Sequence, residues 1–248
     1  MVYLNLVISD DLIDEFKICT RLQYNGKLDI KSAKGTSWTF YYRLGRIVWA
    51  SGGTHSFRRW RRQMIQHCPE FDINEVFLCA ENTFLDYWDY EILEFLRKQS
   101  KITLQQVTNI TESTISELLF DLAQQSNYYS MNCERNQKII LDEPMSFTRT
   151  DLSLRYMNEL WHSWSEAGLE NIYPDLAPVL IEAEKLQEMI SPTAYNNVVK
   201  LMNGKYTLRD LTVKMKQDVL SISKFLLPCV HKGILKLVEV PDFELKIS

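Results

Sequence analysis

The residues best suited to binding chemistry form a run of arginines around one tryptophan. Four guanidinium groups and an indole ring stand within five consecutive residues: Arg58, Arg59, Trp60, Arg61 and Arg62. A guanidinium is planar and permanently charged, so it can hold a carboxylate or a phosphate through two parallel hydrogen bonds. Arginine and tryptophan are also favoured at the energetic centres of protein interfaces. The run therefore predicts a surface that binds a protein partner, with nucleic acid as the alternative.

The spacing of apolar residues around this run predicts a short helix. The side expected to pack on the protein carries apolar residues three or four positions apart: Phe57, Trp60, Met64 and Cys68. We expect Arg58, Arg59 and Arg62 to lie on the opposite side, facing solvent, with Arg61 at the edge. This arrangement would leave a row of cations available to an acidic partner.

The charge of the chain is unevenly distributed, although its net value is only −4. Residues 1–68 hold eleven Lys and Arg against five Asp and Glu, whereas residues 69–95 hold eight acids and no base. The two blocks could pair inside the fold, in which case the arginines would contact Glu70, Asp72 or Glu75. They could instead present two surfaces to partners. The sequence leaves both possibilities open.

The sequence offers little support for catalysis or for metal binding. It contains no phosphate-binding GxxxxGK loop, no GxGxxG dinucleotide motif and no GxSxG nucleophile elbow. His67 and Cys68 are neighbours, but adjacent side chains on a helix diverge by about 100° and cannot form a dyad. The other histidines, His55, His162 and His231, stand alone, and no spacing offers the three or four ligands of a metal site. We therefore expect a non-enzyme without catalytic, cofactor-binding or metal-binding residues.

Composition predicts a globular cytoplasmic protein. The chain has 248 residues, of which 46% are apolar and 24% charged. Its five cysteines include no CxxC pair, so we expect free thiols in a reducing compartment: Cys19, Cys68, Cys79, Cys133 and Cys229. The first residues lack the basic and apolar regions of a signal peptide, and no segment has the ~18 apolar residues of a membrane span. We expect no membrane partner.

The elements that must position the arginine helix are predicted by simple periodicities. Ser9 can cap a helix over residues 10–23, with a buried stripe at Leu12, Ile13, Phe16 and Cys19. Residues 27–32, 38–43 and 47–49 follow as strands, because β-branched and aromatic residues alternate with polar ones and turn residues separate the runs. This region therefore predicts one helix and a three-stranded antiparallel meander.

The second half of the chain resembles part of the first. Residues 101–108 (KITLQQVT) match residues 205–212 (KYTLRDLT), and each copy predicts a helix, a short helix, a tight turn, a longer helix and strands. In the first copy the expected helices are 88–99 and 111–125, and the expected strands are Tyr128-Tyr129 and 138–141. In the second copy the expected helices are 193–202 and 217–231, and the expected strand is 234–240. This order is typical of a winged helix. Chance similarity between amphipathic helices is the alternative.

The longer helix of each copy tests the nucleic-acid alternative. Helix 111–125 carries three acidic residues and no Lys or Arg, so a phosphate polyanion would repel it. Helix 217–231 offers only Lys224 and His231, followed by Lys232. Both helices are therefore interpreted as packing or protein-docking helices, and a winged-helix transcription regulator that binds nucleic acid is kept as the alternative function.

Three stretches of the chain match a known family: GKLDIKSAKG at 26–35, YYRLGRIVWASGG at 41–53 and THSFRRWRRQMIQHCP at 54–69. With these runs, residues 1–248 resemble the PATAN domain, the N-terminal output domain of cyanobacterial PatA-type response regulators. In that family the domain precedes a CheY-like receiver. The present sequence shows no such receiver after PDFELKIS, so the resemblance carries phosphorylation-dependent control to no residue here.

The resemblance implies a non-enzymatic output module of two-component signalling. Family members act in phototaxis driven by type IV pili and in heterocyst patterning. Their implied partners are the pilus extension ATPase and a blue-light flavin photoreceptor, and the resemblance implies no catalytic residue.

Together these features predict an α+β protein. We expect residues 1–70 to form the N-terminal helix, the meander and the arginine helix, and residues 86–142 a first winged-helix-like unit. A connector at 143–180, with Trp161 and Trp164 packed on the core, would lead to a second such unit at 181–248.

Overall fold

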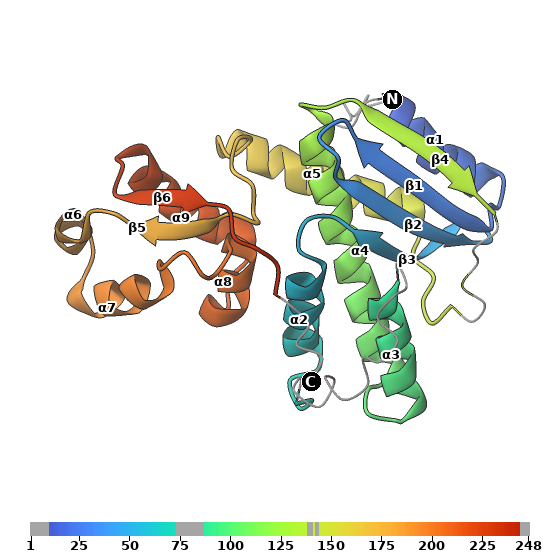
Figure 1. The fold of residues 1–248 in the computed structure, drawn as a ribbon, viewed down its shortest axis with the longest axis horizontal. Coiled ribbons are helices and arrows are strands. Elements are labelled where there is room, and N and C mark those ends of the chain that lie inside the picture. Colours follow the sequence, from blue (N-terminus) through green and yellow to red (C-terminus); the bar gives the residue numbers. More distant parts are fainter. Residues whose placement is uncertain (1–9, 73–86, 138–140, 142–143, 244–248) are drawn as a thin grey trace. The chain divides into compact units, whose positions relative to one another are not determined.

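The computed structural model describes residues 10–72, 87–137, 141 and 144–243 (Figure 1). The chain divides into two compact units: unit 1 is Met1–Trp161 with Phe243–Ser248, and unit 2 is His162–Asp242. Some sequence predictions lie outside the described residues, namely the Ser9 cap, the acidic segment 73–86 with Glu75 and Cys79, and strand residues 138–140. The mixture of helices with antiparallel strands confirms the α+β class.

Unit 1 contains most of the described elements. In chain order they are α1 (Asp10–Arg21), β1 (Gly26–Ser32), β2 (Ser37–Arg43), β3 (Arg46–Gly52), α2 (Ser56–His67), α3 (Trp88–Lys98), α4 (Leu104–Ser126), β4 (Met131–Asn136) and α5 (Thr150–Glu166). The last turn of α5 belongs to unit 2.

The described sheet of unit 1 has four strands in the order β3-β2-β1-β4, all antiparallel. Leu44 and Gly45, both with positive φ (49° and 71°), form the two-residue turn between β2 and β3, as the twist of a hairpin favours. The sequence analysis missed β4, which pairs with β1 along Lys27–Ser32. The strand predicted at Tyr128-Tyr129 is wrong, because these residues lie in the turn that precedes β4.

One face of the sheet is packed, and the other is packed at β3 and the adjacent part of β2 but is partly open at β1 and β4. On one face, Phe16 of α1 meets Phe40 of β2 edge to face, with 5.0 Å between ring centroids, in a core completed by α4 and α5. On the other face, Tyr41 and Trp49 join a second core with α2 and α3. Successive residues of a strand point to opposite faces, so a strand buried on both sides is apolar throughout, as residues 47–50 of β3 are.

Helix α4 links the two cores and is continuous. Its first half contributes Val107 and Ile110 to one core, and its second half contributes Ile115 and Leu118 to the other. The turn predicted before residue 111 is therefore wrong for this copy. A break there would expose side chains that the two cores bury, and the buried Thr111 hydroxyl instead donates to the Val107 carbonyl at 2.9 Å.

Unit 2 contains the remaining described elements. They are β5 (Ala177–Leu180), α6 (Ala183–Met189), α7 (Pro192–Leu201), α8 (Leu208–Met215), α9 (Val219–His231) and β6 (Leu235–Val238), and β5 pairs antiparallel with β6. A turn does separate α8 from α9, because Lys216 adopts a left-handed backbone with φ 53°. The Asp218 side chain then accepts the Ser221 amide at 2.8 Å and starts α9.

Candidate partner-binding site on helix α2

Two glycines set the path of the chain from β3 into α2. Gly52 has φ +92°, and a Cβ at this position would clash with the carbonyl oxygen of Ser37 on the neighbouring strand. Gly53 also has a positive φ, +76°. Other residues pay a steric penalty in this conformation, so the glycine pair allows the sheet edge to turn directly into the arginine helix.

The apolar side of α2 packs as the sequence predicts. Phe57, Trp60, Met64 and Cys68 are all buried and belong to the second core of unit 1. Trp60 is therefore a core residue rather than an exposed contact residue.

Two of the four arginines point into unit 1. Arg59 is 2% exposed, and its Nη2 donates to the Gly52 carbonyl at 2.8 Å. Arg62 is 6% exposed, and its Nη2 lies 2.6 Å from Oε1 of Glu117 on α4. The expectation that Arg59 and Arg62 face solvent is wrong. Residues three apart share a side of a helix, and this side of α2 faces α4.

The other two arginines surround an aromatic ring from a distant part of the sequence. The guanidinium carbon of Arg58 lies 3.9 Å from the ring centroid of Phe243, and that of Arg61 lies 5.3 Å from it. Arg58 is only 5% exposed, so its predicted solvent-facing position is also wrong. Arg61, predicted at the edge, is the exposed member of the run.

Phe243 completes a cluster of four aromatic rings. The rings of Phe57 and Trp88 stack with centroids 5.9 Å apart, and Trp60 lies 5.9 Å from Trp88 at a tilt. Phe243 meets Phe57 edge to face, at 6.4 Å and 89°. We call the surface formed by Phe57, Arg58 and Arg61 the aromatic slot of α2. Such geometry is favourable for aromatic pairs and for a cation over a ring.

A buried carboxyl interacts with Arg59 inside unit 1. Asp89 of α3 is 2% exposed, and its Oδ1 accepts the indole N–H of Trp49 at 3.1 Å. Burial raises the pKa of the Asp89 carboxyl to about 6, although the charge of Arg59 and the Trp49 hydrogen bond oppose the rise. Asp89, from the acidic stretch 69–95, therefore interacts with Arg59 inside the fold. Arg62 instead pairs with Glu117, which lies outside that stretch.

His67 and Cys68 turn to separate partners. The His67 Nε2 lies 3.0 Å from the Ser113 hydroxyl on α4, whereas Cys68 is buried in the second core, where burial raises the pKa of its thiol to about 11.

The four cysteines within the described ranges are free thiols. Among the same residues, no group of three or more His, Cys, Asp or Glu is placed to hold a metal ion.

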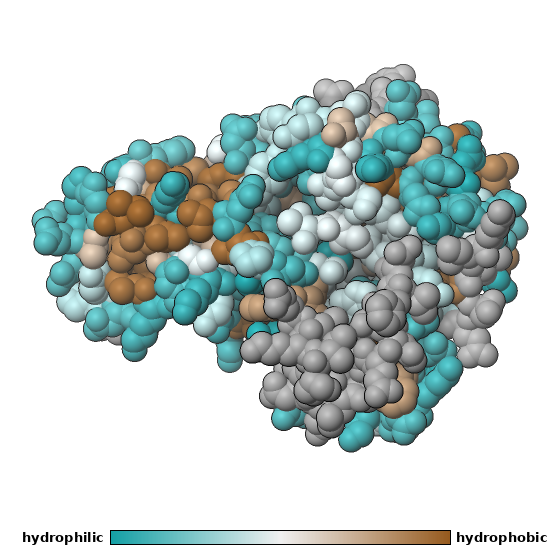
Figure 2. Space-filling view, viewed as in Figure 1, coloured by the Kyte–Doolittle hydropathy of each residue, from teal (hydrophilic) through white to brown (hydrophobic). Residues whose placement is uncertain are grey.

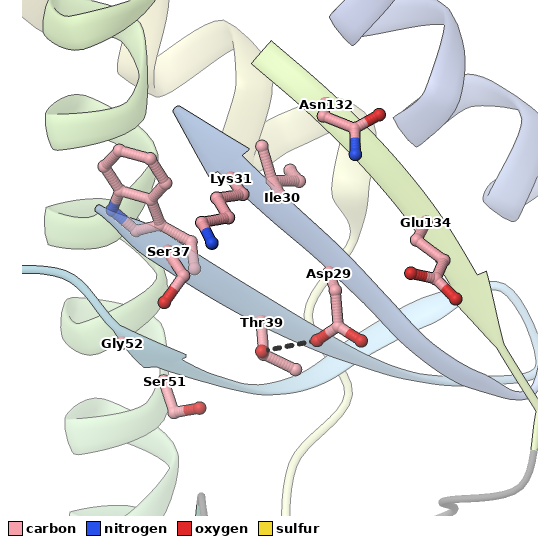
Figure 3. Close-up of a pocket in the computed structure, with 10 residues that line it drawn as sticks. Asp29, Ile30, Lys31, Ser37, Thr39, Ser51, Gly52, Asn132 and Glu134 are labelled. Atoms are coloured by element: carbon pink, nitrogen blue, oxygen red, sulfur yellow. Dashed lines mark hydrogen bonds between the residues drawn. The ribbon is translucent and has the colours of Figure 1, made fainter. Parts of the chain in front are cut away.

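A polar hollow of about 340 Å³ lies on the sheet of unit 1 and is lined by residues of β1, β2, β3 and β4 (Figure 3). Asp29 is its central charge: it accepts the Thr39 hydroxyl at 2.7 Å and pairs with Lys27 at 3.0 Å. Glu134 stands opposite Asp29 on β4, and Asn132 stands opposite Lys31. Sequence reasoning missed this hollow because it depends on β4, whose residues Met131–Asn136 show only a weak apolar alternation.

Unit 2 offers two further surfaces. The exposed residues of α9 include Lys224, Phe225 and His231, and the basic residues exposed from α8 to β6 are Lys214, Lys216, Lys224, Lys232 and Lys236. Separately, Figure 2 shows hydrophobic surface gathered on unit 2. Ile181, directly after β5, is 57% exposed.

No protein-family model, curated protein or solved structure matches this chain. No helix in the part of the chain that the structure describes has the length and apolar character needed to cross a bilayer.

Proposed function

We propose that this chain is a non-enzymatic signal-transduction output module that binds protein partners through α2. The observation that carries the proposal is the contact of the Phe243 ring with the guanidinium groups of Arg58 and Arg61. The surface of α2 thus has the chemistry to hold an aromatic side chain of a segment distant in sequence. Buried aromatics combined with arginine are the composition of interface hot spots.

The four arginines of α2 contribute to this function in different ways. Arg59 and Arg62 hold α2 on the body of unit 1 through Gly52 and Glu117. Arg61 is exposed and can meet a carboxylate of a partner. A charge at the rim of an interface mainly raises the association rate, because it steers an acidic partner toward the surface.

The resemblance to the PATAN domain supplies candidates for the partner and the process. On this basis we propose that the module acts in the cytoplasm, within two-component signalling, and binds a pilus extension ATPase or a blue-light flavin photoreceptor. It would thereby control motility such as phototaxis. The support for this assignment is the set of residue runs at 26–69, which includes α2 itself.

Binding of the purified chain to each of these two candidate proteins tests the proposal. We expect Arg61→Glu to weaken binding tenfold or more, about 1.4 kcal/mol, without changing the thermal midpoint. Arg46→Glu makes the same charge change at an exposed residue of β3 and is the matched control. Equal affinity of the Arg61 and Arg46 variants would overturn the role of α2. If a variant at Ile181 lost partner binding while the Arg61 variant kept it, the docking surface would lie on unit 2.

A second candidate function is nucleic-acid binding by unit 2. The observation that favours it is the exposure of all five lysines between α8 and β6, on a helix-turn-helix arrangement. Each lysine that contacts a phosphate makes binding more sensitive to salt. Duplex DNA retained at physiological ionic strength, and released by Lys224→Glu with Lys232→Glu, would support this function over protein binding. Equal retention of the wild type and this double variant would contradict it.

A further inference from the structure

The aromatic slot of α2 is occupied by the chain itself in this structure. Phe243 belongs to unit 1, although the 81 residues before it form unit 2. Its ring packs on the second core, edge to face with Phe57, while the guanidinium carbons of Arg58 and Arg61 lie 3.9 and 5.3 Å from its centroid. The slot is therefore built from groups that each favour an aromatic ring.

The slot favours an aromatic side chain over an aliphatic one of similar size. The negative face of a ring attracts a guanidinium, and its positive edge attracts the face of another ring. Both interactions are present around Phe243, and a leucine in the same place would keep only the apolar contact. The chemistry of the slot thus selects the ring itself.

The sequence around Phe243 adds a second feature of the ligand. In the sequence, Asp242 precedes Phe243 and Glu244 follows it, so the phenylalanine has an acidic neighbour on each side along the chain. The slot contributes two guanidinium groups, one of them exposed. The charges of the segment and the slot are therefore complementary, which favours both association rate and specificity.

We propose that the aromatic slot is the binding site for a partner segment in which an aromatic residue is flanked by carboxylates, and that Phe243 is its internal competitor. The partner chemistry rests on the proposed function, protein binding through α2. The segment around Phe243 has the same chemistry as the partner segment, so the two exclude each other. Binding of the partner then requires release of Phe243.

This competition has a quantitative consequence. The apparent dissociation constant of a partner rises in inverse proportion to the fraction of molecules with an empty slot. A tethered ligand acts at an effective concentration of the order of millimolar, so even a weak internal contact can occupy most molecules. If Phe243 fills the slot in about nine molecules of ten, removing it raises partner affinity about tenfold.

The test uses the full chain and a labelled peptide of its own residues 241–248, PDFELKIS, as the probe. We expect Phe243→Ala to bind this peptide at least tenfold more tightly than the wild type by fluorescence anisotropy. Phe147→Ala is the matched control, because it removes an exposed phenylalanine of unit 1 outside the slot. Adding Arg61→Ala to Phe243→Ala should abolish most of the gain, and thermal unfolding checks that each variant is folded.

Changes in the peptide separate ring recognition from charge. Replacing its phenylalanine by alanine or leucine should weaken binding to the Phe243→Ala chain tenfold or more. Replacing its aspartate and glutamate by asparagine and glutamine should weaken binding at low salt and have less effect at high salt. Equal binding of the phenylalanine and alanine peptides would overturn the proposal, as would equal affinity of the wild-type and Phe243→Ala chains.

Two outcomes distinguish failure of this inference from failure of the proposed function. A candidate partner protein that binds the wild-type and Phe243→Ala chains equally, and is not displaced by the peptide, contradicts the inference and leaves protein binding intact. A peptide that binds as expected, together with absence of binding by any candidate partner protein, supports the slot and contradicts the proposed partners.

Discussion

The two sides of helix α2 carry the same residue type in different environments. Arg59 and Arg62 lie on the side that faces the interior of unit 1, where they contact the Gly52 carbonyl and the Glu117 carboxylate. Arg58 and Arg61 lie on the side that holds Phe243, and Arg61 is exposed. Both pairs have the spacing of three residues that places side chains on one side of a helix.

This difference teaches that an arginine run need not act as one surface. A buried guanidinium must be hydrogen-bonded or paired, because removal of a charge from water is costly, so the inner pair has a structural role. An exposed guanidinium costs little to hold and remains available to a partner. Mutations should therefore separate the inner pair, which controls stability, from the exposed Arg61, which controls binding.

The largest effect is expected at the ion pair between Arg62 and Glu117. The two side chains are 7% and 12% exposed, so removing one partner leaves the other charge in a poorly solvated position. We expect Arg62→Ala to lower the free energy of unfolding by about 3–5 kcal/mol, measured by urea denaturation.

The double change Arg62→Met with Glu117→Met controls for lost volume. Replacement of a buried ion pair by apolar residues is often nearly neutral, so this variant should recover most of the loss. A single variant as stable as the wild type would mean that Arg62 belongs with the outer pair.

The second effect concerns pH and the buried Asp89, which interacts with Arg59. Burial raises the pKa of its carboxyl to about 6 in the folded state, from 3.8 for an ordinary aspartate. The folded state then binds the proton more tightly than the unfolded state. Stability from Asp89 is therefore fully present below about pH 4 and is lost as pH rises through 6.

Asparagine at position 89 provides the comparison, because it keeps an acceptor for Trp49 but does not titrate. Relative to Asp89→Asn, we expect the wild type to lose about 2 kcal/mol of unfolding free energy between pH 4 and pH 7, at ~1.4 kcal/mol per pKa unit. Denaturation of both proteins across this range measures the difference. If the difference in unfolding free energy between the two proteins does not change with pH, or shifts in favour of the wild type as pH rises, then Arg59 holds Asp89 ionised.

The smallest stability effect is expected at Arg61, the exposed member of the outer pair. Arg61 is exposed and contacts Phe243 at 5.3 Å, so Arg61→Ala should change the free energy of unfolding by less than about 1 kcal/mol. The same denaturation experiment as for Arg62 gives a direct comparison between residues adjacent in sequence. A loss comparable to that of Arg62→Ala would erase the distinction between the two sides of α2.

The apolar side of α2 was predictable from sequence, whereas the fate of its arginines was not. Phe57, Trp60 and Met64 follow the helical period, and burial of that stripe requires only that the helix pack on something. The arginines were expected in solvent because charged residues are rarely buried alone. Their partners Glu117 and Phe243 lie 55 and 185 residues away from Arg62 and Arg58, so local spacing contains no information about them.

The fourth strand shows the same limit. β4 has little apolar alternation, so its place in the sheet is set by hydrogen bonding to β1 rather than by a local pattern. The hollow at Asp29, which lies between β2 and β4, was unpredictable for the same reason.

The sequence by itself determined where α4 and α8 begin, and only the tertiary structure decided how far each continues. Thr103 and Thr207 each start a helix through a capping box, with Gln106 and with Asp210, because a cap needs only residues within one turn. Although both helices start with the same kind of cap, α4 continues for 23 residues, whereas α8 ends after eight. The residues after the first turns of α4 are buried by two cores, whereas Lys214 and Lys216 at the end of α8 are exposed. A helix continues where packing buries its next turn, and that burial is supplied by residues remote in the chain.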